Sequence, residues 1–162
     1  MKADKFMTDE QLQLMIRLEE GYRFTLETEK RHEQLFAPYG ITFPVYRTIA
    51  YLLRHPEGAA PSQIADDLLI LRQSMTNVLD TLEKRNLVER IADPQDRRRL
   101  IVKLLPDGKA LGMEMVNKES AYGNRITEYM GQSDLDEFHR LNRKIYEAKV
   151  AALNDILSER KK

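Results

Sequence analysis

The sequence contains no cysteine and has few glycines and prolines for its 162 residues. Without thiols, the chain cannot form a disulfide, an all-cysteine zinc site, a cysteine nucleophile or a thiol redox switch. Its first residues lack an apolar segment of signal-peptide length, and no run approaches the roughly 18 apolar residues that span a membrane. We therefore expect a soluble, cytoplasmic protein that has no membrane partner.

The sequence also lacks the motifs of common enzyme sites, such as GxGxxG, HExxH, GxSxG and the phosphate-binding GxxxxGK. His32, His55 and His139 lie far apart, so solvated or core histidines are favoured over a metal site. The neighbouring acids Asp66 and Asp67 are better explained as solvated side chains than as catalytic ones. We expect no catalytic residue, no cofactor, no bound metal and hence no enzymatic activity.

Charge gives a weak signal. The 26 basic and 26 acidic residues cancel, which counts against indiscriminate nucleic-acid binding. Between residues 72 and 103, however, eight basic residues outnumber five acidic ones. This local excess is too modest to decide the function by itself.

The composition favours a mainly helical chain, because 32% of the residues are charged and helix breakers are few. Thr8 and Gln11 have the spacing of a capping box that begins a helix, expected to run to about residue 36. Pro44 suits the first turn of a second helix. Another long helix is expected from residue 106 to Gly131, and Ser133 would begin the last one. The apolar stripes of these terminal helices are most simply core and dimer seam, which a second copy of the chain would bury.

The middle of the chain has the pattern of a helix, a tight turn, a polar-faced helix and a hairpin. Ser62 is expected to cap a short helix that runs to about residue 69. The helix expected over residues 72–84 has an apolar stripe at i, i+3, i+4 and i+7, formed by Met75, Val78, Leu79 and Leu82. Asn86 suits a left-handed helix end. Residues 87–91 and 100–104 are predicted strands, joined by a charged turn over residues 93–98.

The opposite side of residues 72–84 carries polar and basic side chains, most of which can hydrogen-bond a base edge or a phosphate. By itself this pattern would indicate an ordinary solvated helix face. The arginine-tipped hairpin beside it favours a DNA-reading module instead. The arginines at positions 97–99 could alternatively form a plain charged tip or bind another acidic partner.

Residues 41–111 resemble the winged helix-turn-helix of the MarR (multiple antibiotic resistance regulator) family of bacterial transcription factors. The matching residues are Ser62-Gln63-Ile64-Ala65, Thr76, Asp80-x-Leu82-Glu83-x-Arg85-Asn86-Leu87-Val88-x-Arg90, Asp93-Pro94-x-Asp96-Arg97-Arg98 and Leu104-x-x-x-Gly108-x-x-Leu111. The helices before and after match the family's dimerisation region in layout only. Two departures are Leu69-Ile70-Leu71, where the family often has Gly-Leu-Asp or Gly-Leu-Ser, and Pro106 in place of a Thr or Ser cap. The first departure leaves the conformation of the turn open.

The resemblance implies a sequence-specific DNA-binding transcription regulator that acts as a homodimer, by family habit a repressor, on a pseudo-palindromic operator of double-stranded DNA. The polar-faced helix would lie in the major groove, and Arg98, oriented by Asp96, would enter the minor groove. The DNA-contact residues implied in this way are Ser62, Gln63, Arg72, Gln73, Ser74, Thr76, Asn77, Lys84, Asp96, Arg97 and Arg98. The alternative is a winged-helix protein-interaction module without specific DNA binding.

An aromatic-rich zone lies where the first two helices are expected to meet the middle module. Its simplest interpretation is hydrophobic core. The resemblance offers a second interpretation, a pocket for a small aromatic or phenolic effector that would release DNA by population shift. The residues of this zone are His32, Phe36, Tyr39, Phe43, Tyr46, Arg47 and Tyr51.

We therefore expect a mainly α fold with a small two- to three-stranded wing, in which a winged helix-turn-helix is flanked by N- and C-terminal dimerisation helices. Residues 41–105 would form the DNA-binding region. Residues 1–40 and 106–162 would form the helical dimerisation region, all within one continuous domain.

Overall fold

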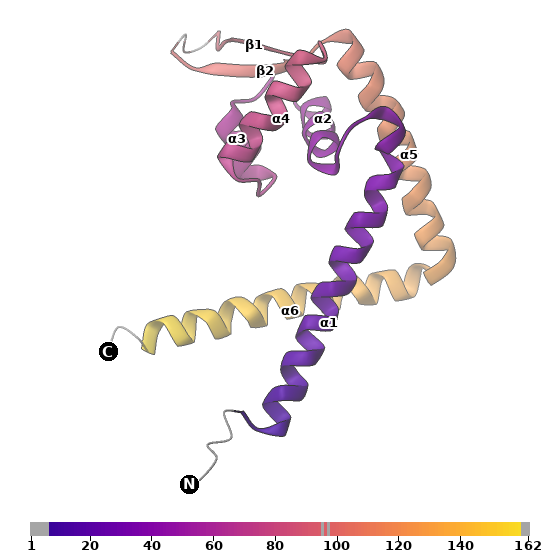
Figure 1. Ribbon diagram of the computed structural model, residues 1–162, viewed down its shortest axis with the longest axis vertical. Coiled ribbons are helices and arrows are strands. Elements are labelled where there is room, and N and C mark those ends of the chain that lie inside the picture. The colour runs from indigo at the N-terminus through magenta and orange to yellow at the C-terminus, as the bar shows by residue number, and fades with distance from the viewer. Residues whose placement is uncertain (1–6, 95, 97, 160–162) are drawn as a thin grey trace. The chain divides into compact units, whose positions relative to one another are not determined.

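The computed structural model describes residues 7–94, 96 and 98–159. It is mainly helical with a two-stranded antiparallel sheet, which confirms the predicted fold class (Figure 1). The elements in chain order are α1 (Asp9–His32), the short 3-10 helices η1 (Glu33–Leu35) and η2 (Ala37–Tyr39), α2 (Phe43–Arg54), α3 (Pro61–Asp67), α4 (Arg72–Lys84), β1 (Val88–Ala92), β2 (Leu100–Leu104), α5 (Pro106–Met130) and α6 (Gln132–Glu159). The chain divides into two compact units between Val116 and Asn117, inside α5.

The first helix begins as predicted. Thr8 Oγ1 accepts the backbone N–H of Gln11 at 3.2 Å, and Gln11 Oε1 accepts that of Thr8 at 2.8 Å, which completes the capping box. α1 ends at His32, earlier than expected, because the chain tightens into η1 and η2 before Gly40 turns it with φ +63°. α6 begins at Gln132, one residue before the predicted start.

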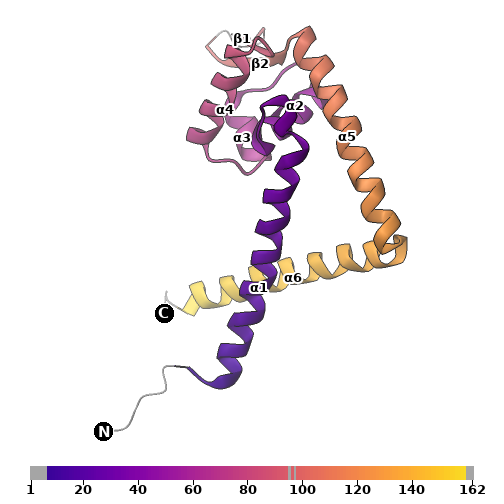
Figure 2. The ribbon, with the colours of Figure 1, turned by 45° about the vertical axis from the view of Figure 1, so that its right-hand side comes forward.

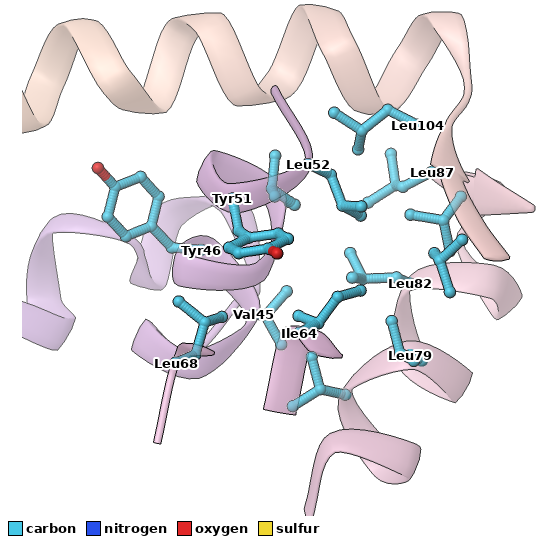
Figure 3. Packing of buried hydrophobic residues seen from close by; sticks show 14 of the residues in the cluster. Val45, Tyr46, Tyr51, Leu52, Ile64, Leu68, Leu79, Leu82, Leu87 and Leu104 are labelled. Atoms are coloured by element: carbon cyan, nitrogen blue, oxygen red, sulfur yellow. The ribbon is translucent and has the colours of Figure 1, made fainter. Parts of the chain in front are cut away.

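One hydrophobic core holds α2, α3, α4, the hairpin and the first part of α5 together. The side chains of Val45, Ile64 and Leu82 point toward one another from α2, α3 and α4 (Figure 3). The predicted apolar stripe of α4 is confirmed, since all four of its members are buried: Met75, Val78, Leu79 and Leu82. Fully burying a side chain of this size contributes roughly 1.5–3 kcal/mol. The stripe therefore fixes which side of α4 can face outward.

Two glycines allow α5 to approach the core closely. A Cβ at Gly108 would collide with the carbonyl oxygen of Leu87, and one at Gly112 would lie 2.6 Å from Cγ2 of Ile49. Any larger residue at either position would push α5 away from α2 and the hairpin. Close packing of α5 against Leu87 thus explains why position 108 in the quoted motif is a glycine.

The turn between α3 and α4 contains a left-handed residue although the chain has no glycine there. The N–H of Leu69 donates to the carbonyl oxygen of Asp66 at 3.2 Å, and that of Ile70 donates to Ala65 at 2.9 Å. These two bonds form a Schellman helix end, which places the residue after the cap in the left-handed region. Leu69 accordingly has φ +53°, at a cost of roughly 1–2 kcal/mol for a residue that carries a Cβ. α3 therefore ends at Asp67, earlier than expected, and the leucine turn keeps the shape that glycine would give.

α4 spans the predicted residues and ends in the same way as α3. The N–H groups of Asn86 and Leu87 donate to the carbonyl oxygens of Glu83 and Leu82, at 2.9 and 3.0 Å. Asn86 has φ +57°, which confirms its predicted left-handed conformation.

The prediction that Ser62 caps α3 is wrong. Pro61 is the first residue of the helix and Ala60 is its N-cap, and no side chain caps this end. The fixed φ of proline suits a first helical position, so the N-cap lies two residues earlier than expected. Ser62 and Gln63 still lie in the first turn and are exposed.

The hairpin pairs Val88 with Leu104 and Ala92 with Leu100 in antiparallel register. β2 has the predicted bounds, and β1 is displaced by one residue. The backbone N–H of Val102 also donates to the carbonyl oxygen of Ala59 at 2.8 Å, with the reverse bond at 3.2 Å. This bridge joins the loop before α3 to the sheet and so fixes the wing against the helix-turn-helix.

The helices at the chain ends carry many exposed apolar side chains. Neither α1 nor α6 has a buried residue, and most of α1 extends away from the core (Figure 2). Their exposed large apolar residues are Leu12, Leu14, Met15, Ile16, Leu18, Tyr22, Phe24 and Leu26 in α1, and Phe138, Leu141, Ile145, Tyr146, Val150, Leu153, Ile156 and Leu157 in α6. Across the described residues, no helix combines the length and apolar content that crossing a membrane requires.

The strained turn yields a prediction in which glycine has opposite effects at two exposed positions. Leu69→Gly should raise the free energy of unfolding by about 1 kcal/mol, because it relieves the left-handed strain and the residue is 93% exposed. Ala110→Gly is the control, since Ala110 is exposed inside α5, where glycine relieves no strain. It should lower the free energy of unfolding by about 1 kcal/mol through backbone entropy. Urea unfolding measures both, and a destabilised Leu69→Gly would contradict the strain argument.

Candidate nucleic-acid interface

α4 turns a set of polar and basic side chains away from the core. We call this set the polar face; it comprises Arg72, Gln73, Ser74, Thr76, Asn77 and Lys84, all of which are exposed. These are all the residues of α4 that the sequence nominates for DNA contact. Their amide, hydroxyl and cationic groups can donate to base edges or phosphates.

Arg72, at the start of the polar face, has a carboxylate partner on α3. Its Nη2 lies 3.1 Å from Asp66 Oδ2, and the two side chains are 73% and 61% exposed. A pair this exposed contributes less than about 1 kcal/mol. A phosphate or a base edge can therefore replace the carboxylate at little cost, and Arg72 remains available.

The wing contains the predicted contact between Arg98 and Asp96. Asp96 Oδ1 accepts both the Nε–H of Arg98 at 3.2 Å and its backbone N–H at 3.1 Å. The carboxylate thus orients the arginine, whose side chain is 92% exposed. Arg97, the other nominated wing residue, lies outside the described residues.

Two arginines that the sequence counts toward the local basic excess hold the fold together instead. Arg90 on β1 pairs with Asp80 at 2.6 Å and with Glu83 at 2.8 Å, both on α4. Arg85 donates to the carbonyl oxygens of Gly40 and Tyr39 at 3.1 and 3.0 Å, which ties the end of α4 to the connection before α2. Sequence reasoning missed both roles, because the partners are distant in the chain or are backbone atoms.

Gln63 on α3 lies beside two cations that the sequence did not nominate. A hollow of about 290 Å³ is lined by Gln63 together with Arg99 and Lys103 of the hairpin. The carboxylates of Glu57 and Asp93 line it as well, so its charge is mixed. The available signal was the alternation of residues 101 and 103 along β2, which continues back to Arg99 just before the strand.

The structure brings some of the rings of the predicted aromatic zone into contact. The rings of Phe36 and Tyr46 stack with centroids 4.4 Å apart, and those of His32 and Phe43 lie 4.9 Å apart. Phe36 and Tyr46 are buried, which supports the core interpretation for these two. The hydroxyl of Tyr39 donates to Glu114 Oε1 on α5 at 2.6 Å.

An open groove of about 380 Å³ lies beside the rings, between α1 and α2. Phe43 and Arg47 are the only nominated effector residues among the described residues that line it. The other lining residues are Leu26, Glu29, Lys30, Glu33 and Pro44. Arg47 also donates to the carbonyl oxygen of Leu68 at 3.0 Å, so it connects the groove with the end of α3.

Tyr51 contacts two residues that do not belong to the predicted aromatic zone. Its ring stacks on His55 at 4.0 Å and its hydroxyl donates to Asp67 Oδ2 at 2.7 Å. Burial and this hydrogen bond raise the pKa of Tyr51 to about 12. Tyr51 therefore braces α2 against α3.

In chemical terms, the arrangement offers hydrogen-bond donors and positive charge. Hydrogen-bond donors gather on the polar face and on Arg98. In the described part of the chain, no group of three or more histidine, aspartate or glutamate side chains is placed to hold a metal ion.

The chain resembles known proteins in sequence and in fold. A sequence model of the MarR family matches residues 39–99. The HTH-type transcriptional regulator PrsX of Escherichia coli is 27% identical over 126 residues, which cover 77% of this chain and 74% of that protein. The transcriptional repressor CouR, solved bound to a 23-mer DNA duplex, is 28% identical with a TM-score of 0.69, covering 77% of this chain and 88% of its own. CouR from Rhodococcus jostii RHA1 bound to p-coumaroyl-CoA is 20% identical in its structural match, with a TM-score of 0.67, covering 76% and 87%.

The raised pKa of Tyr51 predicts an alkaline effect on stability. Because the folded-state pKa is about 12, above the ordinary value of 10, the contribution of Tyr51 is complete below pH 10 and is lost as the pH rises toward 12. Tyr51→Phe should cost about 1 kcal/mol at pH 7, and the difference from the wild type should shrink between pH 10 and 12. Urea unfolding across this range measures the difference. The exposed Tyr129→Phe is the control; a constant difference for Tyr51→Phe would refute the assignment.

Proposed function

This chain belongs to the MarR family of DNA-binding transcription regulators, and we propose that it acts as a homodimeric repressor on a pseudo-palindromic operator. The observation that carries the proposal is the combination of an exposed polar face on α4 with an exposed arginine on the adjacent wing. Membership of a regulator family argues against enzymatic activity.

In the proposed complex, α4 enters the major groove. Gln73, Thr76 and Asn77 are suited to base edges, while Arg72, Ser74 and Lys84 are suited to phosphates or bases. Ser62 and Gln63, in the first turn of α3, would contact the backbone beside the groove. Arg98, held by Asp96, would enter the adjacent minor groove, where a narrow A·T-rich segment attracts a guanidinium. Arg97 stays part of this proposal on the basis of the motif alone.

The homodimer is supported by the exposed apolar residues of α1 and α6. Leaving so many large apolar side chains in water is unfavourable, and a second copy offers a matching surface for a two-fold contact. Residues 1–40 and 106–162 would supply the dimer contact, and residues 41–105 the DNA contact. Two copies of α4 spaced about 34 Å apart would then meet successive major grooves.

We further propose that the groove between α1 and α2 binds a small aromatic or phenolic effector. Phe43 offers a ring face, and Arg47 and Lys30 offer positive charge. The ring of His32 and the stacked rings of Phe36 and Tyr46 lie next to Phe43. CouR, which has been solved with p-coumaroyl-CoA, provides a precedent for an aromatic ligand in this fold. Because Arg47 also contacts Leu68 at the end of α3, a ligand in the groove would act on the helix-turn-helix through Arg47.

Arg98→Ala should weaken binding to an operator duplex, recovered from genomic DNA of the protein's own source, by about tenfold or more. The slope of log affinity against log salt should fall by about one per arginine removed, because fewer counterions are released. A fluorescence titration at several salt concentrations measures both. Arg125→Ala is the matched control, since Arg125 forms a similarly exposed ion pair on α5.

Near-normal binding by Arg98→Ala would remove the wing from the proposal. Binding that scarcely responds to salt, or a protein that retains no specific duplex, would instead favour a protein-interaction module. Size-exclusion chromatography of Arg98→Ala should give the same oligomer as the wild type, which separates loss of DNA contact from loss of assembly.

The effector proposal predicts that simple aromatic acids, with or without a phenolic hydroxyl, lower operator affinity. Benzoic and hydroxybenzoic acids should do so, whereas the saturated analogue cyclohexanecarboxylic acid should not, because it cannot stack on the Phe43 ring. Phe43→Leu should reduce the ratio of affinities measured without and with the aromatic acid. If aromatic and saturated acids act equally, or none acts, this effector class is wrong.

A further inference from the structure

The turn between α3 and α4 exposes a leucine directly before the first residue of the polar face. Leu71 is the N-cap residue of α4, immediately before Arg72, and its side chain is 78% exposed. This position usually carries Ser, Thr, Asp or Asn, whose oxygen accepts a free N–H of the first turn. Leucine has no such oxygen, and no side chain caps α4.

The fold gains little from the Leu71 side chain. The core contact of the turn is made by Ile70, which is half-buried and packs against the hydrophobic cluster. Leu71 belongs neither to that cluster nor to the partly buried residues around it. A residue that helps neither the cap nor the core points to a role outside the folded chain.

The surroundings of Leu71 indicate the role. The next residues along the chain, Arg72, Gln73 and Ser74, begin the polar face and are exposed. In helix-turn-helix proteins the N-terminal residues of the second helix reach the base edges of the major groove. Only one group on those edges is apolar, the C5-methyl of thymine.

We propose that Leu71 contacts a thymine C5-methyl group in each half-site and so selects thymine at one operator position. This inference rests on the proposed DNA-binding function and adds to it a specificity-determining residue. The methyl group would be removed from water against the leucine side chain, beside the hydrogen bonds that the polar face makes. Among the nominated contact residues only Thr76 carries a methyl group, and it lies more than one turn further along α4.

Deoxyuridine tests the contact directly, because it differs from thymidine only by the missing methyl group. A duplex is first selected by the wild-type protein from a randomised library, and each thymine is then replaced by deoxyuridine symmetrically in both half-sites. At one position the replacement should weaken wild-type binding about 15-fold, the value expected for losing one buried methyl contact in each half-site. Leu71→Ala should bind the thymine duplex more weakly by a similar factor and should be insensitive to deoxyuridine there.

Leu69→Ala is the matched control, since Leu69 is the other exposed leucine of the turn and belongs to the end of α3. It should keep the wild-type response to deoxyuridine. The proposal is overturned if no position responds, if Leu71→Ala responds like the wild type, or if Leu69→Ala loses the response equally. It is also overturned if Leu71→Ala changes the oligomer seen by size-exclusion chromatography, because Leu71 would then contact a second copy. Failure to enrich any duplex would refute the DNA-binding proposal itself.

Discussion

Burial of one stripe of α4 against α2 and α3 is the constraint on which the rest of the structure depends. Met75, Leu79 and Leu82 are almost completely removed from water by residues such as Ile49, Leu52 and Ile64. Turning α4 about its axis would expose these side chains, each at a cost of roughly 1.5–3 kcal/mol. The polar face therefore points outward because the opposite face is anchored. Burial of the apolar stripe is therefore sufficient to set the orientation of the polar face without charge interactions.

The neutral net charge of the chain is compatible with DNA binding once the arginines are sorted by their partners. Arg85 and Arg90 are occupied by backbone carbonyls and by two carboxylates of α4, so they stabilise the module. Arg72 has an exposed carboxylate partner that a phosphate can replace at little cost, and the side chain of Arg98 is itself exposed. Under the proposed function, specific binding would rely on a few placed cations, and the absence of net charge would limit attraction to unrelated DNA.

Features set by neighbours in the sequence could be predicted, and features set by distant residues could not. The stripe of α4, the left-handed Asn86 and the contact between Asp96 and Arg98 all depend on residues a few positions apart. The cap of α3 was assigned to Ser62 because the residue type fits, but Pro61 occupies the first turn and shifts the helix. Tyr51 was grouped with the aromatic zone by proximity in sequence, and only the fold places it against Asp67. The groove beside α1 depends on packing that no local pattern encodes.

The leucine turn shows how tertiary packing overrides local preference in this module. Leu69 adopts the left-handed backbone conformation that glycine adopts more easily than leucine. Leu71 provides no side-chain hydrogen bond to cap the start of α4. The turn forms nonetheless, because its two Schellman hydrogen bonds and the packing of Ile70 fix the angle between α3 and α4. The far end of α4 is held by Arg85 to the connection that follows α1. α4 is thus fixed at one end by the turn and at the other by the connection. Under the effector proposal, a ligand beside α1 and α2 can shift the reading helix through Arg47 near the turn or through Arg85 at the other end.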